Sequence, residues 1–161
     1  MLNEENKASH GQSIALLCLR VSLGMLLVWW GLAKIVKPAM GMKVQEKFYL
    51  DLFHSVDLQY AFGYVQVIVG LCVVLGFKRK FAIPAQLAIT GFSALMILPA
   101  LLDPFALYLP FKKLAGIQHL FYPTVIALCG AAVMITFRKQ DRWNLDNVLE
   151  NRKAAAEPAA A

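Results

Sequence analysis

Five side chains with polar or titratable tips recur at a similar place in three long apolar tracts of this sequence. They are Trp30 in the first tract, Tyr64 and Gln66 in the second, and His119 and Tyr122 in the fourth. Each lies five to eight residues from the same end of its tract, which is ~7–12 Å along a helix that rises about 1.5 Å per residue. Of these, only His119 titrates near neutral pH and can pass a proton.

This layer fits two different arrangements. In the first, the side chains line a pocket for a flat amphipathic molecule such as a quinone, whose oxygens bond to Gln66 or His119. In the second, they satisfy one another's hydrogen bonds and hold the helices together. Equal depth does not decide between the two, because it does not fix the direction in which a side chain points. The candidate pocket residues are Trp29, Trp30, Tyr64, Gln66, Gln118, His119 and Tyr122.

Patterns typical of other chemistries are absent from the sequence. It has no P-loop, Rossmann glycine pattern, serine elbow or pair of carboxylates. Its histidines, cysteines and acids do not have the spacing of metal ligands, so we expect no metal site. No catalytic residue is assigned, and a quinone is the only cofactor that the residues suggest.

Four apolar tracts carry the candidate residues and dominate the chain. They cover residues 13–36, 58–77, 81–102 and 114–137, each 20 to 24 residues long and without an aspartate or glutamate. A helix needs about 20 residues to cross a hydrocarbon layer of ~30 Å, and the tracts lack the alternation of strands. Of the 161 residues, 59% are hydrophobic and only 16% charged, against about 25% charged in a soluble domain. We therefore expect an all-α membrane protein, a bundle of four transmembrane helices.

The basic residues predict how this bundle sits in the bilayer. If both termini share one side, that side holds ten Lys and Arg residues, including the turn at 78–80, against six on the other. The positive-inside rule then places both termini in the cytoplasm. The formal charge of +6 requires no nucleic acid as partner, because basic residues near a membrane bind anionic lipid.

The segments outside the tracts complete the predicted architecture. Residues 1–12 are predicted to be a polar tail, 13–149 the membrane domain, and 150–161 a disordered, Ala-rich tail. In the first outer loop, Val44, Phe48 and Leu52 recur every four residues, which predicts a short amphipathic helix.

Two basic residues, Arg20 and Lys34, lie near opposite ends of the first tract. Lys34 is two residues from the outer end and is expected to anchor the helix at the interface. Arg20 lies seven residues in from the inner end. Its guanidinium either snorkels to the inner headgroups or pairs with a polar group of the bundle such as Gln86.

The order of several residues resembles the DoxX family of small four-helix membrane proteins, over roughly residues 14–149. The residues that carry the resemblance are Arg20, Gly24, Gly31, Lys34, Pro38, Gly63, Gly70, Gly76, Arg142 and Asp146. The glycines are interpreted as points where helices approach closely. The resemblance implies a four-helix bundle in a bacterial cytoplasmic membrane. The family includes a subunit of thiosulfate:quinone oxidoreductases and partners of other redox systems. Many relatives carry an acid where this chain has Gln66, which cannot take up a proton.

Three functions follow as expectations. The favoured one is an auxiliary subunit or membrane partner of a quinone-linked oxidoreductase or redox-stress system, without catalytic activity alone. The alternative is a scaffold or assembly factor whose outer loop, residues 37–57, binds an extracytoplasmic partner. A small-molecule carrier is the third, and the lack of acids in the tracts argues against a proton-driven one. The oligomeric state stays open.

Overall fold

The structure, a computed structural model, describes residues 10–48, 55–98, 102–103, 108 and 118–156. This described part is helical and contains no strand. Its helices are α1 (His10–Val36), α2 (Pro38–Phe48), α3 (Val56–Leu75), α4 (Arg79–Met96), α6 (Gln118–Thr136) and α7 (Leu145–Ala156). The prediction of an all-helical chain is thus confirmed over these residues.

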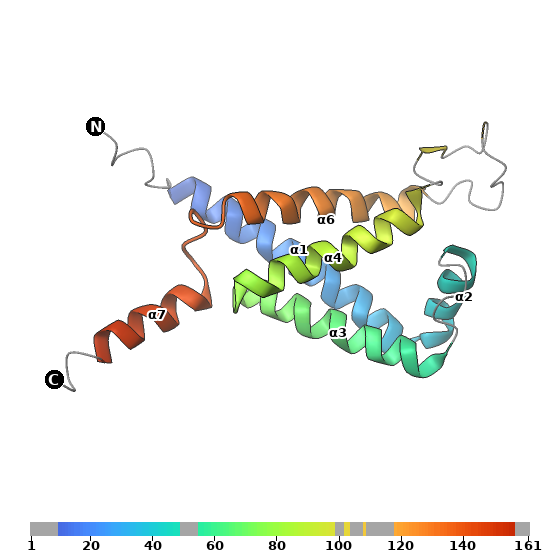
Figure 1. Cartoon of the computed structure of the whole chain (residues 1–161), viewed down its shortest axis with the longest axis horizontal. Coiled ribbons are helices and arrows are strands. Elements are labelled where there is room, and N and C mark those ends of the chain that lie inside the picture. The colour runs from blue at the N-terminus through green and yellow to red at the C-terminus, as the bar shows by residue number, and fades with distance from the viewer. Residues whose placement is uncertain (1–9, 49–54, 99–101, 104–107, 109–117, 157–161) are drawn as a thin grey trace.

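Four long helices, α1, α3, α4 and α6, form the body of the molecule (Figure 1). The chief packing contacts join α1 to α3 and α4 to α6. Helix α2 packs against α1 and α3 at one end of the body, which we call the α2 end. The segment after α6 and helix α7 leave the body at the opposite end, which we call the tail end.

The four long helices correspond to the four predicted tracts. By length and composition, α1 and α3 are long and apolar enough to cross a membrane. Helices α4 and α6 do not reach that criterion over their described residues. The four-span arrangement therefore stays a prediction. The short helix predicted after the first tract is present as α2, and residues 49–54 of that loop lie outside the described residues.

Both terminal segments differ from the prediction. The disordered tail expected from residue 150 is wrong for residues 150–156, because α7 continues to Ala156. The Asn144 side chain accepts a hydrogen bond from the Asn147 N–H at 2.9 Å, which caps the helix start, and alanine has the highest helix propensity. The polar N-terminal tail is also shorter than residues 1–12, because α1 begins at His10. Residues 1–9 and 157–161 lie outside the described residues.

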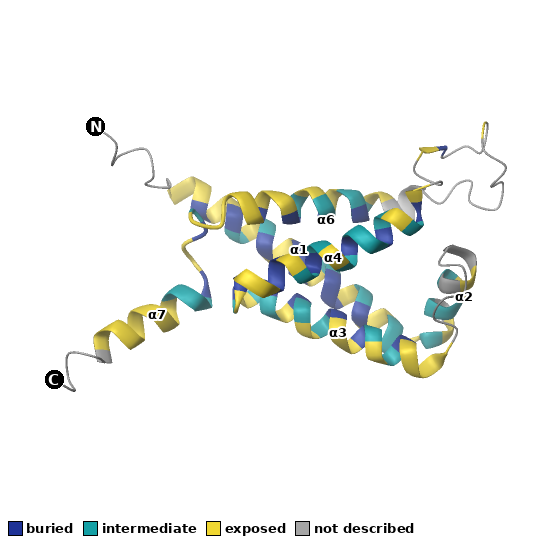
Figure 2. Ribbon diagram, in the orientation of Figure 1, coloured by how far each residue is buried: buried dark blue, intermediate teal, exposed yellow. Residues whose placement is uncertain are grey.

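Buried residues line the interior of the bundle and exposed ones its outside (Figure 2). The interior holds polar side chains beside an apolar core that includes Leu27, Ile83 and Met134, and many large apolar side chains are exposed. Each long helix buries a polar residue to 1–2% exposure: Arg20, Gln66, Gln86 and Thr124. Each also presents an apolar residue that is 61–70% exposed: Trp29, Ile68, Leu95 and Ile126. Soluble proteins rarely expose large continuous apolar patches, so this outer surface suits contact with lipid.

Paired glycines bring α1 and α3 into close contact. A Cβ atom placed on Gly24 would lie 2.7 Å from the Gly70 carbonyl oxygen, and one on Gly31 would lie 2.6 Å from that of Gly63. A side chain at any of these positions would push the two backbones apart. The prediction that these glycines mark close approach is confirmed, and small residues are typical of membrane helix interfaces.

Candidate functional site

The side chains of the predicted pocket do not face one interior space where the structure describes them. Trp29, Tyr64 and Tyr122 are 70%, 56% and 59% exposed, so they lie on the outside of the bundle. Trp30 is half-buried, and Gln66 is buried. The common depth of these residues stays a prediction, and the rotation of each helix about its axis turns their side chains in different directions.

The remaining two members of the predicted pocket, Gln118 and His119, open α6. Their side chains lie outside the described residues. The proton transfer considered for His119 therefore stays a prediction. Over the described residues, no group of three or more His, Cys, Asp and Glu side chains is placed to hold a metal ion.

An amide in the bundle interior joins two helices. The Gln86 Nε2 donates a hydrogen bond to the Leu23 carbonyl oxygen at 3.0 Å, which ties α4 to α1. Bonds of this kind hold helices together where no water competes. The sequence allowed either a ligand pocket or hydrogen bonds between helices. A hydrogen bond between helices is found at Gln86, which is not one of the predicted pocket residues. The side-chain oxygens of Gln66 and Gln86 have no hydrogen-bond partner in the described part of the chain.

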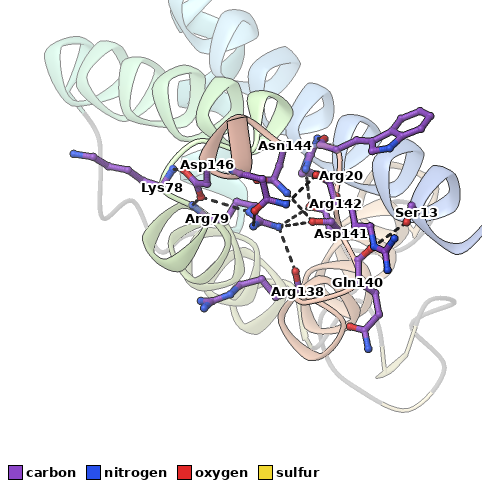
Figure 3. Close-up of polar contacts among 12 residues, drawn as sticks. Ser13, Arg20, Lys78, Arg79, Arg138, Gln140, Asp141, Arg142, Asn144 and Asp146 are labelled. Atoms are coloured by element: carbon purple, nitrogen blue, oxygen red, sulfur yellow. Dashed lines mark hydrogen bonds and ion pairs between the residues drawn. The ribbon is translucent and has the colours of Figure 1, made fainter. Parts of the chain in front are cut away.

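The densest polar contacts lie at the tail end, where α1, the start of α4 and the segment after α6 meet (Figure 3). We call this group of side chains the tail-end cluster. Its members are Arg20, Arg79, Asp141, Asn144 and Asp146. Two arginines and two aspartates make it formally neutral.

Asp141 is the centre of the cluster. Its Oδ2 accepts hydrogen bonds from the Arg20 Nη1 at 2.6 Å and from the Arg79 Nη1 at 3.2 Å. The Asp141 side chain is fully buried, and those of Arg20 and Arg79 are 2% and 10% exposed. In such a site an arginine without its partner would be a buried, uncompensated charge.

The position of Arg20 decides between its two predicted arrangements. Its guanidinium does not snorkel to a surface, because it is buried and also donates to the Trp143 carbonyl oxygen. It pairs with a polar group as the second alternative proposed, but the partner is Asp141 and not Gln86. At the other end of α1, Lys34 donates to the Trp30 carbonyl oxygen and lies over the Phe62 ring.

Arg79 fastens the segment after α6 to the start of α4. Its Nη1 donates to the carbonyl oxygens of Arg138 and Asp141, at 3.2 and 2.9 Å. Its Nη2 donates to the Asn147 Oδ1 at 3.2 Å. The five N–H groups of a guanidinium allow this one side chain to reach several acceptors at once.

Asp146 supplies the cap that α4 lacks locally. The Lys78 side chain makes no capping bond, and Asp146 accepts instead from the Lys78 and Arg79 N–H groups, at 2.7 and 3.0 Å. A carboxylate at a helix N-terminus also interacts favourably with the helix dipole. The Gly76 carbonyl oxygen receives the Asp146 N–H in return, at 3.2 Å.

Gly76 ends α3 in the left-handed region, with φ 66°. A Cβ there would lie 2.6 Å from the Asn144 Cβ and 2.8 Å from the Arg20 Nη1. Glycine is thus required both by the backbone conformation and by the arginine and asparagine packed against it.

Sequence reasoning missed Asp141, Asn144 and the pairing role of Arg79. Arg79 was counted only as a basic residue of the 78–80 turn. One signal was available: none of the four tracts contains an acid, so a buried Arg20 had to find its counter-charge in a segment outside them.

Comparison of the chain with family models, with curated proteins and with solved structures finds no match. The geometry of the tail-end cluster indicates its role. The arginines and aspartates of the cluster bond to one another, to backbone groups and to the Asn147 side chain, whereas the Arg20 Nε and the Asp141 Oδ1 have no hydrogen-bond partner among the described residues. This arrangement fastens α1, α4 and the chain after α6 together.

Proposed function

We propose that this protein is an integral membrane protein in which α1, α3, α4 and α6 all cross the bilayer, with both termini in the cytoplasm. The observation that carries the proposal is the distribution of side chains, which is the same on all four helices. Each of the four helices buries a polar residue and exposes a large apolar one. A lipid surrounding suits such an exterior, which supports the same environment for α4 and α6 as for α1 and α3.

The helix lengths support four spans. The shortest of the four, α4, has 18 residues, which is about 27 Å at the helical rise. This is close to a hydrocarbon thickness of ~30 Å. The tail-end cluster then lies at the cytoplasmic face, with the basic residues Lys80 and Lys139 exposed nearby, as the positive-inside rule requires.

Within the membrane we propose a role as a DoxX-like auxiliary subunit of a quinone-linked oxidoreductase or redox-stress system in a bacterial cytoplasmic membrane. Most residues that carry the resemblance have structural roles here. Arg20 and Asp146 build the tail-end cluster, and four glycines join α1 to α3. What this chain shares with the family is thus the framework of the bundle, which favours a supporting subunit over an enzyme acting alone.

A scaffold that holds a partner without a share in redox chemistry is the second candidate. Helix α7 favours it, because α7 projects from the tail end of the bundle (Figure 1). Val148 and Leu149 on this helix are 48% and 37% exposed. Exposed apolar side chains on a projecting helix are available to a cytoplasmic partner.

Cysteine labelling in intact cells tests the four spans. In a variant with Cys18, Cys72 and Cys129 replaced by alanine, single cysteines replace Lys43, Lys80, Tyr108 or Lys153, all of which are exposed. Four spans predict that a membrane-impermeant maleimide labels Lys43→Cys and Tyr108→Cys from outside, and labels the other two only after the cells are opened. Protection of Tyr108→Cys in intact cells would indicate that α4 and α6 do not cross, and labelling of Lys80→Cys or Lys153→Cys in intact cells would contradict the proposed topology.

Purification in mild detergent tests the redox role. A partner that co-purifies and reduces or oxidises a quinone would support the auxiliary subunit, whereas a partner without such activity would support the scaffold. Deletion of residues 148–161, which removes most of α7 but keeps Asp146 and its bonds to the start of α4, is expected to lose a partner bound through that helix. Purification of the chain alone, at every detergent concentration that extracts it, would count against both functions.

A further inference from the structure

An open pocket of about 450 Å³ lies at the α2 end, where α1 turns into α2. Its lining residues are Val36, Lys37, Pro38, Ala39 and Lys43. Three apolar side chains thus share the pocket with two lysines, and no acid stands among these lining residues. A pocket of this composition suits a ligand with an anionic head and an apolar body.

The two lysines have no ion pair with any of the described residues. Lys37 and Lys43 are both exposed, and neither side chain has an ion pair or a side-chain hydrogen bond within the described residues. Lys34, one turn earlier, is already engaged with the Trp30 carbonyl oxygen and the Phe62 ring. The pocket therefore has two free ammonium groups to offer to an anion.

An exposed apolar stripe on α1 leads into this pocket. Trp29, Leu32 and Val36 are 70%, 42% and 70% exposed. Their spacing of three and then four residues places them on one face of the helix. The stripe extends ~10 Å along α1 at the helical rise, and Val36 belongs to both the stripe and the pocket wall.

We propose that this pocket binds an anionic phospholipid, with the phosphate between Lys37 and Lys43 and an acyl chain along Trp29, Leu32 and Val36. The inference rests on the membrane insertion proposed above. A zwitterionic phospholipid shares the chain and the phosphate, but its ammonium group opposes the lysines. Inorganic phosphate shares the charge but has nothing to place along the stripe.

Quenching of Trp29 fluorescence tests the proposal. The chain has three tryptophans, so the double variant Trp30→Phe/Trp143→Phe leaves Trp29 as the single emitter, about 10 Å from the pocket along α1. This variant is reconstituted in phosphatidylcholine vesicles that contain brominated-chain phosphatidylglycerol or, separately, brominated-chain phosphatidylcholine. We expect phosphatidylglycerol to quench at a much lower mole fraction than phosphatidylcholine.

Charge-removing variants identify the site. Each lysine near a membrane surface contributes about fivefold to anionic lipid affinity, so Lys37→Gln/Lys43→Gln is expected to reduce the preference by roughly 25-fold. The matched control is Lys80→Gln/Lys139→Gln, which removes two exposed lysines at the tail end. This control is expected to keep the preference for phosphatidylglycerol. As a second measurement without tryptophan changes, the wild-type chain should retain phosphatidylglycerol through detergent purification, and Lys37→Gln/Lys43→Gln should not.

Four results would overturn the proposal, and they separate its parts. Equal quenching by both lipids, or an unchanged preference in Lys37→Gln/Lys43→Gln, would eliminate the lipid site and leave membrane insertion intact. If inorganic phosphate, added at constant ionic strength, abolished the preference for phosphatidylglycerol, the ligand of the pocket would be a free anion and not a lipid. Absence of quenching by either lipid would contradict membrane insertion itself, and with it the proposed function.

Discussion

Replacement of Asp141 with alanine is expected to lower the free energy of unfolding by about 3–5 kcal/mol, because it removes one partner of a buried ion pair. Arg20 would stay at 2% exposure with no carboxylate beside it. Arg79 would lose the same acceptor. The loss should appear as a large decrease in the midpoint of thermal unfolding of the detergent-solubilised protein.

Two further variants separate the ion pair from the segment that carries it. Arg142→Gln changes an exposed residue next to Asp141 and is expected to change the free energy of unfolding by no more than about 0.5 kcal/mol. Arg20→Met/Asp141→Leu removes both charges and is expected to recover much of the stability, because the Arg20 charge is gone and Arg79 keeps its ion pair with Asp146. An Asp141→Ala protein as stable as the wild type would show that Arg20 does not depend on this aspartate.

Replacement of Gly24 with alanine is expected to destabilise the bundle by about 1–3 kcal/mol, the usual cost of overpacking a tight interface. The new Cβ would lie 2.7 Å from the Gly70 carbonyl oxygen and 2.8 Å from the Val74 backbone nitrogen. Neither backbone atom can move without separating α1 from α3. The same thermal unfolding measurement detects the loss.

Gly91 provides the matched control for this substitution. It also lies inside a bundle helix, but a Cβ there would meet only the Leu128 Cδ1, at 3.5 Å, which is an ordinary contact. Gly91→Ala is therefore expected to be neutral or to stabilise α4 by about 0.5–1 kcal/mol, since alanine favours the helix. If both alanine variants behaved alike, the close approach of α1 and α3 would not be what Gly24 provides.

The two substitutions affect different parts of the same framework. The glycines hold α1 against α3 within the body, whereas Asp141 holds the chain after α6 against α1 and α4 at the tail end. In the topology proposed here, the second contact fixes where α7 leaves the membrane surface. Loss of Asp141 should therefore weaken the binding of a partner to α7 more than loss of Gly24 does.

The sequence by itself determined the long helices of this protein, but not α7. Long apolar tracts without acids are expected to form helices, because a helix satisfies its backbone groups within one segment. The described helices follow the tracts within a few residues. The exceptions are the end of the third tract and the start of the fourth tract, where residues 99–101 and 114–117 lie outside the described residues. Close approach of helices at Gly24, Gly31, Gly63 and Gly70 was also predictable, because glycine permits it, whereas the pairing of Gly24 with Gly70 and of Gly31 with Gly63 comes from the structure.

Only the tertiary structure decided which side chains meet. Arg20 and Asp141 are 121 residues apart, and Asp146 caps a helix that begins 67 residues before it. No local pattern in the chain encodes such pairs. Counting along a tract gives a position along a helix, but it could not give the direction of Trp29, Tyr64 and Tyr122. Rotation of a helix about its axis is set by packing against its neighbours, and here that packing turned these aromatic residues outward and Arg20 inward.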